Sequence, residues 1–262
     1  MSATTPHIDV RDLTMAYGTN VVMRELNFQV SRGEIFVIMG GSGCGKSTLL
    51  RHMIGLLQPA SGEIFYNGKT FTKATAAEHQ RMLRTFGVLY QSGALWSSLT
   101  LAENIATPLE EFTDLKRNEI ADIVSYKLSL VGLGGFEEYY PSEISGGMKK
   151  RAALARAMAL DPEILFFDEP SAGLDPITSR RLDELILEIS RSMNTTVVLV
   201  THELPSLLGI GDNSIFLDVT TKRQGPIGNP SFLKDHSTNP NVRKFLNRGE
   251  SPSPTTQATP GP

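Results

Sequence analysis

A glycine-rich loop after a continuously apolar stretch constrains the fold of this chain more than any other feature. Residues 40–47 read Gly-Gly-Ser-Gly-Cys-Gly-Lys-Ser, which matches the pattern G-x-x-x-x-G-K-[ST] completely. Residues 34–39 before it are apolar after the first, as in a buried strand, and Leu49, Met53 and Leu57 after it repeat with helical spacing. Glycine lets the backbone curl so that its N–H groups point inward, and the helix N-terminus adds free N–H groups. This context predicts a phosphate-binding loop between a strand and a helix.

The residues of this loop have distinct expected roles toward a bound nucleotide. Lys46 is expected to reach the β- and γ-phosphates, Ser47 to coordinate Mg²⁺, and Thr48 to meet the α-phosphate. Cys44 occupies a variable position of the pattern, so we expect it to fill space and not to act as a nucleophile. The predicted cofactors are ATP and Mg²⁺, and the loop residues expected to bind them are Gly40, Gly41, Ser42, Gly43, Cys44, Gly45, Lys46, Ser47 and Thr48.

A second apolar run ends in two neighbouring acids. Residues 164–169 read Ile-Leu-Phe-Phe-Asp-Glu, a strand pattern with Asp168 at its tip. An acid in this place meets the same magnesium as the loop hydroxyl, so Asp168 and Ser47 are predicted metal ligands. Side chains of adjacent strand residues point to opposite faces, which leaves Glu169 to orient and deprotonate the attacking water. Taken alone, the two acids would more often be an exposed end of a strand, and it is the glycine loop before them that favours the functional interpretation.

Strand and helix patterns alternate over most of the chain. Further buried strands are predicted near residues 197–200 and 215–219. Before them, Asp175 is placed to cap a helix with Pro176 in its first turn. This alternation predicts an α/β domain with a mainly parallel core sheet.

The middle and the end of the chain depart from this alternation. The middle is rich in helix patterns, and Thr100 with Glu103 forms a capping box at one helix start. We predict a helical subdomain of about residues 92–160, inserted in a single domain of residues 7–249. Residues 250–262 contain four prolines among Ser, Thr and Gln, so they are predicted to be a disordered tail.

A third motif lies between the loop and the acids. Residues 144–151 read Ile-Ser-Gly-Gly-Met-Lys-Lys-Arg at the start of a basic helix, where a hydroxyl, two unhindered amides and a helix N-terminus suit an anion. The motif resembles the signature sequence of the ABC (ATP-binding cassette) ATPases, and the order of the three motifs is that of the family. The resemblance implies ATP hydrolysis by a P-loop NTPase (RecA-like) core sheet with an N-terminal antiparallel β subdomain. It also implies a head-to-tail homodimer, in which Ser145, Gly146 and Gly147 close over the γ-phosphate on the second protomer.

Four further positions resemble functional residues of that family. Gln91 resembles the glutamine that meets Mg²⁺ and the attacking water, and His202 resembles the histidine that contacts the γ-phosphate. Tyr17 resembles the aromatic residue that stacks on adenine. Asp175 lies in a segment that resembles the D-loop, which implies a dimer contact besides the helix cap. The resemblance therefore predicts Glu169, His202 and Gln91 as the catalytic group, although each of these four residues also has a plain structural interpretation.

One position departs from the family pattern. Met148 stands where the signature usually has glutamine, and methionine cannot make the amide hydrogen bond, although Ser145 and the glycine amides remain. We expect hydrolysis to survive with a weaker hold on the γ-phosphate. This methionine and the segment at residues 239–246 resemble the Mla/Mce-linked lipid-transport ATPases.

The narrower resemblance implies partners and a cargo. Two copies would lie under a membrane permease dimer (MlaE-like), with a possible STAS-domain subunit (MlaB-like). The cargo would be phospholipid moved between the inner and outer membranes without touching this chain. Residues 92–96 are predicted to receive a permease helix through Leu95 and Trp96, unless both pack inside the helical subdomain. A transporter for another cargo and a regulatory ATP-binding scaffold of a membrane complex remain the alternatives.

Composition excludes several other classes of protein. The net charge of −3 gives no general attraction to nucleic acid, and the single cysteine cannot form an internal disulfide or a zinc cluster. No stretch approaches about 18 uninterrupted apolar residues, and residues 1–7 carry no signal pattern. These features predict a cytoplasmic chain that does not span a membrane, and the resemblance implies a peripheral place on the cytoplasmic face of the inner membrane, held there by a partner.

Overall fold

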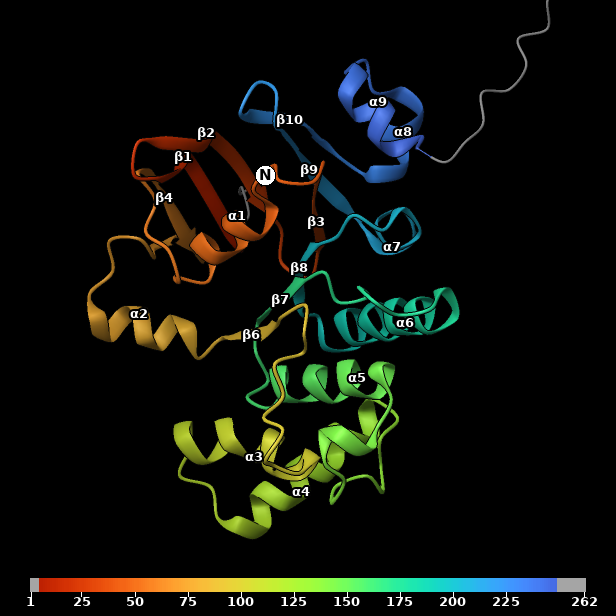
Figure 1. Cartoon of the computed structure of the whole chain (residues 1–262). Coiled ribbons are helices and arrows are strands. Elements are labelled where there is room, and N and C mark those ends of the chain that lie inside the picture. Colours follow the sequence, from red (N-terminus) through yellow and green to blue (C-terminus); the bar gives the residue numbers. More distant parts are fainter. Residues whose placement is uncertain (1–4, 249–262) are drawn as a thin grey trace, which may run out of the picture.

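Two sheets of different kinds form the core of the chain (Figure 1). The computed structural model describes residues 5–248, so the tail predicted to be disordered lies outside them. The smaller sheet has the strand order β2-β1-β4-β5 and is antiparallel. The larger sheet has the order β10-β9-β3-β8-β7-β6, in which only the edge strand β10 is antiparallel to its neighbour. The predicted α/β core with an N-terminal antiparallel subdomain is confirmed.

The elements alternate through the larger sheet as the sequence patterns indicate. The strands are β1 (Ile8–Tyr17), β2 (Asn20–Val30), β3 (Ile35–Gly40), β4 (Ser61–Tyr66), β5 (Lys69–Thr70), β6 (Phe86–Leu89), β7 (Ile164–Asp168), β8 (Thr196–Val200), β9 (Asn213–Asp218) and β10 (Arg223–Gly228). The helices are α1 (Lys46–Met53), α2 (Ala76–Leu83), α3 (Leu101–Phe112), α4 (Arg117–Leu130), the 3₁₀ turn η1 (Pro141–Glu143), α5 (Gly146–Ala157), α6 (Pro176–Met193), α7 (Leu204–Ile210), α8 (Pro230–His236) and α9 (Pro240–Leu246). Within residues 5–248, no helix combines the length and the apolar character that crossing a membrane requires.

The central strands are apolar on both faces because the larger sheet is covered on both sides. In β3, Phe36 and Ile38 belong to a core shared with α1 and the antiparallel sheet. Val37 and Met39 belong to a second core, shared with α3 to α9. Every other residue of the strand therefore enters a different core, which explains the uninterrupted apolar run.

The helix after the glycine loop is shorter than the apolar spacing predicted. α1 ends at Met53, because Gly55 takes a left-handed backbone with φ of +79° and donates its N–H to the carbonyl of His52 at 3.2 Å. Leu57, which the pattern placed on the apolar face of the helix, lies beyond its end. The carbonyl of Leu57 instead contacts Nδ1 of His52 at 2.9 Å.

Two helix starts follow the predicted capping chemistry. The backbone N–H of Glu103 donates to Thr100 Oγ1 at 3.2 Å, and the N–H of Thr100 donates to the Glu103 carboxylate at 2.7 Å. Asp175 Oδ1 accepts from the N–H groups of Ile177 and Thr178, both at 3.0 Å. These caps fix the first residues of α3 and α6. The cap at Asp175 places the start of α6 a few residues after the end of β7.

Candidate functional site

The glycine loop runs from the end of β3 to the start of α1, and two of its glycines are required by sterics. Gly40 has φ of +153°, and a Cβ there would lie 2.6 Å from Cys44 Sγ. Gly45 has φ of +99°, and a Cβ there would lie 2.7 Å from Cγ1 of Val22 in β2. Cys44 itself is buried behind the loop, and burial raises the pKa of its thiol, in keeping with a packing role. The loop is thus held in one tight conformation.

Ser47 of the loop contacts Asp168 of the acid strand, while Lys46 bonds to the loop backbone. Ser47 Oγ donates to Asp168 Oδ1 at 2.8 Å, so the hydroxyl and the carboxylate share one small space. Lys46 Nζ donates to the carbonyl oxygens of Gly40 and Gly41, both at 3.1 Å. A lysine that bonds only to loop carbonyls can exchange them for stronger charged acceptors such as phosphate oxygens.

The oxygen pair of Ser47 and Asp168 fits a magnesium ion that arrives with a nucleotide. Mg²⁺ is usually bound by one or two carboxylates together with substrate phosphates and waters. Among residues 5–248, no group of three or more His, Cys, Asp or Glu side chains is placed to hold a metal alone. The chain therefore supplies a partial set of ligands, which phosphate oxygens would complete.

One cavity of about 570 Å³ collects predicted site residues from five separate parts of the chain. It lies over the loop, next to the ends of β7 and β8. Tyr17 is half exposed at its side. The predicted residues that line the cavity are Tyr17, Ser42, Gly43, Gly45, Lys46, Ser47, Thr48, Gln91, Glu169 and His202. Two further lining residues, Val22 and Arg248, were not predicted from the sequence.

The two acids point to different partners, but strand alternation is not the whole reason. β7 ends at Asp168, and Glu169 turns out of the strand with a left-handed φ of +50°. Glu169 Oε2 then lies 2.7 Å from His202 Nδ1, while Asp168 stays with Ser47. A non-glycine residue in this conformation is uncommon and stores strain, which is typical of functional sites.

The signature residues lie apart from this cavity. Ser145 caps α5 by accepting from the N–H of Met148 at 3.3 Å. Ser145 and Gly147 line a different cavity, beside Leu174, and neither Gly146 nor Asp175 lines the loop cavity. In Figure 1, α5 lies in the lower half of the molecule and α1 above it on the other side of β6 and β7. Within one chain, the signature and the loop therefore do not meet.

The match to a family decides what this arrangement is. The family described as ABC transporter matches residues 23–172, which include the loop, the signature and the acid pair. The chain belongs to the ABC transporter family. It is an ATPase subunit of that family, and its α/β fold is that of the ABC cassettes.

Named relatives of this ABC ATPase differ in the cargo that their names state. A probable ribonucleotide transport ATP-binding protein, Mkl of Mycobacterium leprae, is 41% identical over 240 residues, which cover 92% of this chain and 68% of the relative. The intermembrane phospholipid transport ATP-binding protein MlaF of Haemophilus influenzae is 43% identical over 205 residues, which cover 78% of each chain. The chain thus spans about two thirds of the length of the Mkl relatives.

A solved dimer shares the fold. The ATP-binding cassette MJ0796, a dimeric structure of a post-hydrolysis state bound to ADP and Pi, superposes with a TM-score of 0.75. Its sequence identity to this chain is 26%, and the match covers 85% of this chain and 98% of that one.

Two basic residues of α5 that sequence reasoning did not select hold the segment after β6 in this ABC ATPase. Lys150 is buried and its Nζ donates to the carbonyl oxygen of Gln91. Arg156 donates to the carbonyls of Ala94 at 2.6 Å and Gly93 at 3.1 Å. Burial lowers the pKa of both side chains. The basic run at the signature is visible in the sequence, but no local pattern shows that these cations bind a distant loop.

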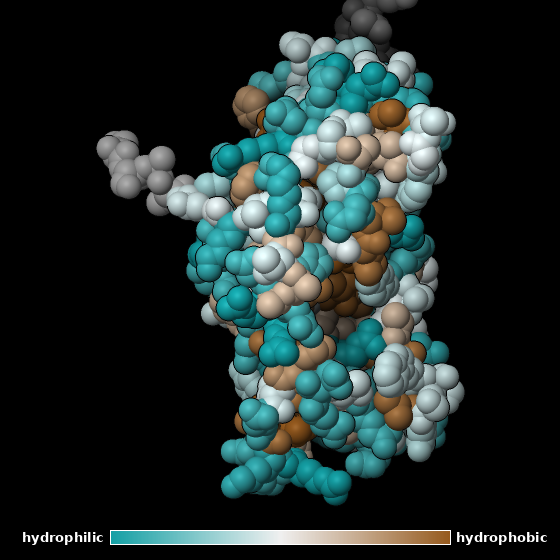
Figure 2. All heavy atoms as spheres, turned by 90° about the vertical axis from the view of Figure 1, so that its left-hand side faces the viewer, coloured by the Kyte–Doolittle hydropathy of each residue, from teal (hydrophilic) through white to brown (hydrophobic). Residues whose placement is uncertain are grey.

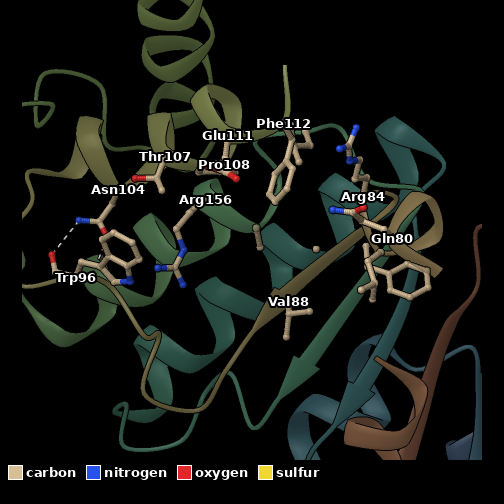
Figure 3. Close-up of a pocket in the computed structure, with 15 residues that line it drawn as sticks. Gln80, Arg84, Val88, Trp96, Asn104, Thr107, Pro108, Glu111, Phe112 and Arg156 are labelled. Atoms are coloured by element: carbon tan, nitrogen blue, oxygen red, sulfur yellow. Dashed lines mark hydrogen bonds between the residues drawn. The ribbon is translucent and has the colours of Figure 1, made fainter. Parts of the chain in front are cut away.

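An apolar groove lies next to that segment. The cavity has a volume of about 640 Å³ and lies between α2, β6, α3 and α5. Figure 2 shows the corresponding face hollowed between the upper and lower parts of the molecule, with apolar residues gathered in the hollow. Figure 3 shows Trp96, Phe112 and Arg84 around it. The Arg84 guanidinium lies 5.4 Å from the centroid of the Phe112 ring, so one wall is cationic as well as aromatic.

Of the segment predicted to receive a permease helix, only Trp96 lines this groove. Its side chain is 58% exposed, and its backbone is fixed by two bonds to the Asn104 side chain, at 2.8 and 3.1 Å. Leu95 instead packs against the buried core of the helical subdomain. Leu95 is half-buried and Trp96 is exposed, so Trp96 is the more accessible of the two, and docking of a permease helix at this pair stays a prediction.

Proposed function

We propose that the 570 Å³ cavity is the ATP site of this ABC ATPase and that Glu169 is its general base. The observation that carries the proposal is the convergence of the loop, Gln91, Glu169 and His202 on one cavity. Tyr17 at its side is placed to stack on adenine. The site residues come from strand ends and loops along the carboxyl edge of the parallel sheet, where ligands of α/β proteins bind.

The residues of the chain divide the reaction among them. Lys46 exchanges the loop carbonyls for the β- and γ-phosphates. Ser47 and Asp168 would hold Mg²⁺, which would neutralise phosphate charge. Glu169 takes the proton of the attacking water, and Gln91 orients that water. His202, now bonded to Glu169, turns its ring toward the γ-phosphate.

The complete site requires a second copy of the chain. Ser145, Gly146 and Gly147 open a helix N-terminus that suits an anion, yet they lie away from the loop of their own chain. A head-to-tail homodimer brings these residues over the γ-phosphate of the partner, with the Asp175 segment at the interface. The dimeric state of the related cassette supports this arrangement.

The apolar groove beside Trp96 is the proposed docking site for a permease helix. A concave apolar surface with an aromatic wall suits the apolar face of a helix. Arg156 and Lys150 tie the adjoining segment, including Gln91, to the signature helix. A movement of the permease helix in the groove can therefore shift Gln91 in the ATP site through these contacts.

Phospholipid is the proposed cargo, moved between the inner and outer membranes. Met148 in the signature, the segment at residues 239–246 and the identity to MlaF proteins support it. The equally similar Mkl relatives carry a ribonucleotide name, so ribonucleotide transport is the second candidate.

The chain would be peripheral, at the cytoplasmic face of the inner membrane, under a permease dimer of the MlaE type. The region after Val219, in which Ile227 and Phe232 are exposed apolar residues, is the proposed contact for a STAS-domain subunit of the MlaB type or for the other protomer.

One preparation tests these assignments together. The Glu169→Gln chain is tagged, purified from native membranes with ATP, and its bound proteins and lipids are identified by mass spectrometry. We expect a permease, a STAS-domain protein and phospholipid, whereas a Lys46→Ala control should not show the ATP-dependent recovery. Recovery of a different permease with no phospholipid would contradict the cargo, and recovery of no membrane protein would favour a regulatory scaffold.

A further inference from the structure

Arg248 is a lining residue of the ATP cavity that no motif predicts. It follows α9, at the far end of the described chain, yet it lines the same cavity as Ser42, Gly43 and Lys46. Among the described residues around this cavity, Lys46 and Arg248 are the two permanently charged cations. The cavity therefore has a second positive charge, supplied from outside the usual motifs.

The helix α9, which ends two residues before Arg248, is fixed beside the loop by several contacts. Asn241 Nδ2 donates to Asp218 Oδ2 at 3.0 Å, and Asp218 is the last residue of β9. The Phe245 ring meets the Phe216 ring of the same strand at 5.6 Å between centroids. β9 is the neighbour of β3, and Leu217 of β9 pairs with Gly40 at the start of the loop. The anchoring of α9 to β9 thus places its C-terminal end next to the phosphate loop.

The guanidinium of Arg248 is held but not neutralised. It lies 4.4 Å from the centroid of the Phe245 ring, a cation–π contact that limits its rotation. Within residues 5–248 it has no carboxylate partner and no hydrogen bond. Its N–H donors are therefore free, and a guanidinium presents them in a planar fork that matches two phosphate oxygens.

We propose that Arg248 donates to phosphate oxygens of the bound nucleotide, so that the turn after α9 contributes a second cation to the phosphate site. The inference rests on the proposed ATP site. Phosphate is the expected acceptor because it is the anionic part of the nucleotide and because Arg248 shares the cavity with the phosphate loop. Nucleoside di- and triphosphates should therefore need Arg248, whereas adenosine should not.

Calorimetric titrations of the full chain with Mg·ATP, Mg·ADP and adenosine test the proposal. Arg248→Ala should weaken ATP binding about tenfold or more, the scale of a lost charge-assisted hydrogen bond, and leave adenosine binding unchanged. Arg248→Lys should retain part of the affinity. Arg243→Ala is the matched control, because Arg243 is exposed on α9 and does not line the cavity.

Two results would overturn the proposal. One is ATP binding by Arg248→Ala within twofold of the parent chain, and the other is an equal loss of ATP and adenosine affinity. A Lys46→Ala titration separates this failure from failure of the ATP site itself. If Lys46→Ala binds ATP like the parent chain, then the site assignment is wrong irrespective of Arg248.

Discussion

His202 Nδ1 lies 2.7 Å from Glu169 Oε2, and the backbone N–H of His202 donates to the same oxygen at 3.3 Å. A carboxylate only accepts hydrogen bonds, so Nδ1 carries the proton in this contact. The two residues follow the neighbouring parallel strands β7 and β8, in which Asp168 pairs with Val200. The proposed base and the proposed γ-phosphate contact are thus hydrogen-bonded to each other.

Loss of this contact should slow turnover more than it weakens binding. His202→Ala removes the group that holds the Glu169 carboxylate, so we expect ATP turnover to fall about 10- to 100-fold, the scale of a lost charge-assisted hydrogen bond. The dissociation constant of ATP should change much less. Steady-state phosphate release and calorimetry measure the two quantities, and His236→Ala, in an exposed histidine, is the control. An unchanged turnover number would show that His202 is structural.

Restoration of glutamine in the signature should tighten the ATP-bound dimer. Met148 is partly buried against the core and shares a cavity with Ser145 and Leu174. A Met148→Gln amide adds one hydrogen bond, worth about 0.5–1.5 kcal/mol, at each of the two shared sites, so the dimer dissociation constant should fall about 5- to 150-fold. Sedimentation equilibrium in a Glu169→Gln background measures it. An identical constant would show that the altered signature is functionally silent.

Trp96 should be required for recovery of the membrane partner. Trp96→Ala removes an exposed aromatic wall of the groove, and such anchors dominate the energy of interfaces. We expect the permease to be lost from pull-downs with the tagged chain. Tyr126→Ala removes an equally exposed aromatic side chain outside the groove and should keep the permease. Thermal unfolding checks both variants, and full permease recovery with Trp96→Ala would move the docking site elsewhere.

Asp183 should make the stability of the chain depend on pH. It is buried between α6 and α7, where Ser206 donates to its Oδ2 at 2.7 Å and Oδ1 has no partner. Burial raises its pKa from 3.8 to about 6. Because this pKa is raised in the folded state, the contribution of Asp183 to the free energy of unfolding is fully present below pH 3.8. It is lost as the pH rises through 6.

Asp183→Asn should therefore stabilise the fold at neutral pH. We expect a gain of about 3 kcal/mol in the free energy of unfolding at pH 7.5, and about half of that at pH 5. Urea unfolding at the two pH values measures the gain. Glu188→Gln, in an exposed residue of the same helix that does not act on Asp183, should show no such gain. An equal effect of Asp183→Asn at both pH values would show that Asp183 is not buried as a charge.

Local patterns predicted the elements that carry their own chemical signals. These elements are the loop, the acid strand and the caps at Thr100 and Asp175. Each is determined by residues close to it in the chain, so a short stretch of sequence is enough to predict it. The end of α1 was missed, although Gly55 was visible, because the apolar spacing continues to Leu57 while the backbone turns left-handed.

Contacts between distant segments were beyond prediction for a different reason. Lys150 meets Gln91 because α5 packs beside the segment after β6, and Arg248 lines the loop cavity because α9 is anchored on β9. No spacing rule links residues so far apart in the chain. The positive φ of Glu169 was also hidden, because glutamate rarely takes that conformation and its cause lies in the neighbouring strand.

The most direct test of the account is the behaviour of Glu169→Gln with Mg·ATP, measured by phosphate release and by light scattering on the same sample. If Glu169 is the general base of a site shared between two chains, phosphate release falls by about 10²-fold or more and the scattering mass doubles as the ATP-bound dimer accumulates. Phosphate release at the rate of the parent chain, from a particle that stays monomeric, would contradict both parts of the claim.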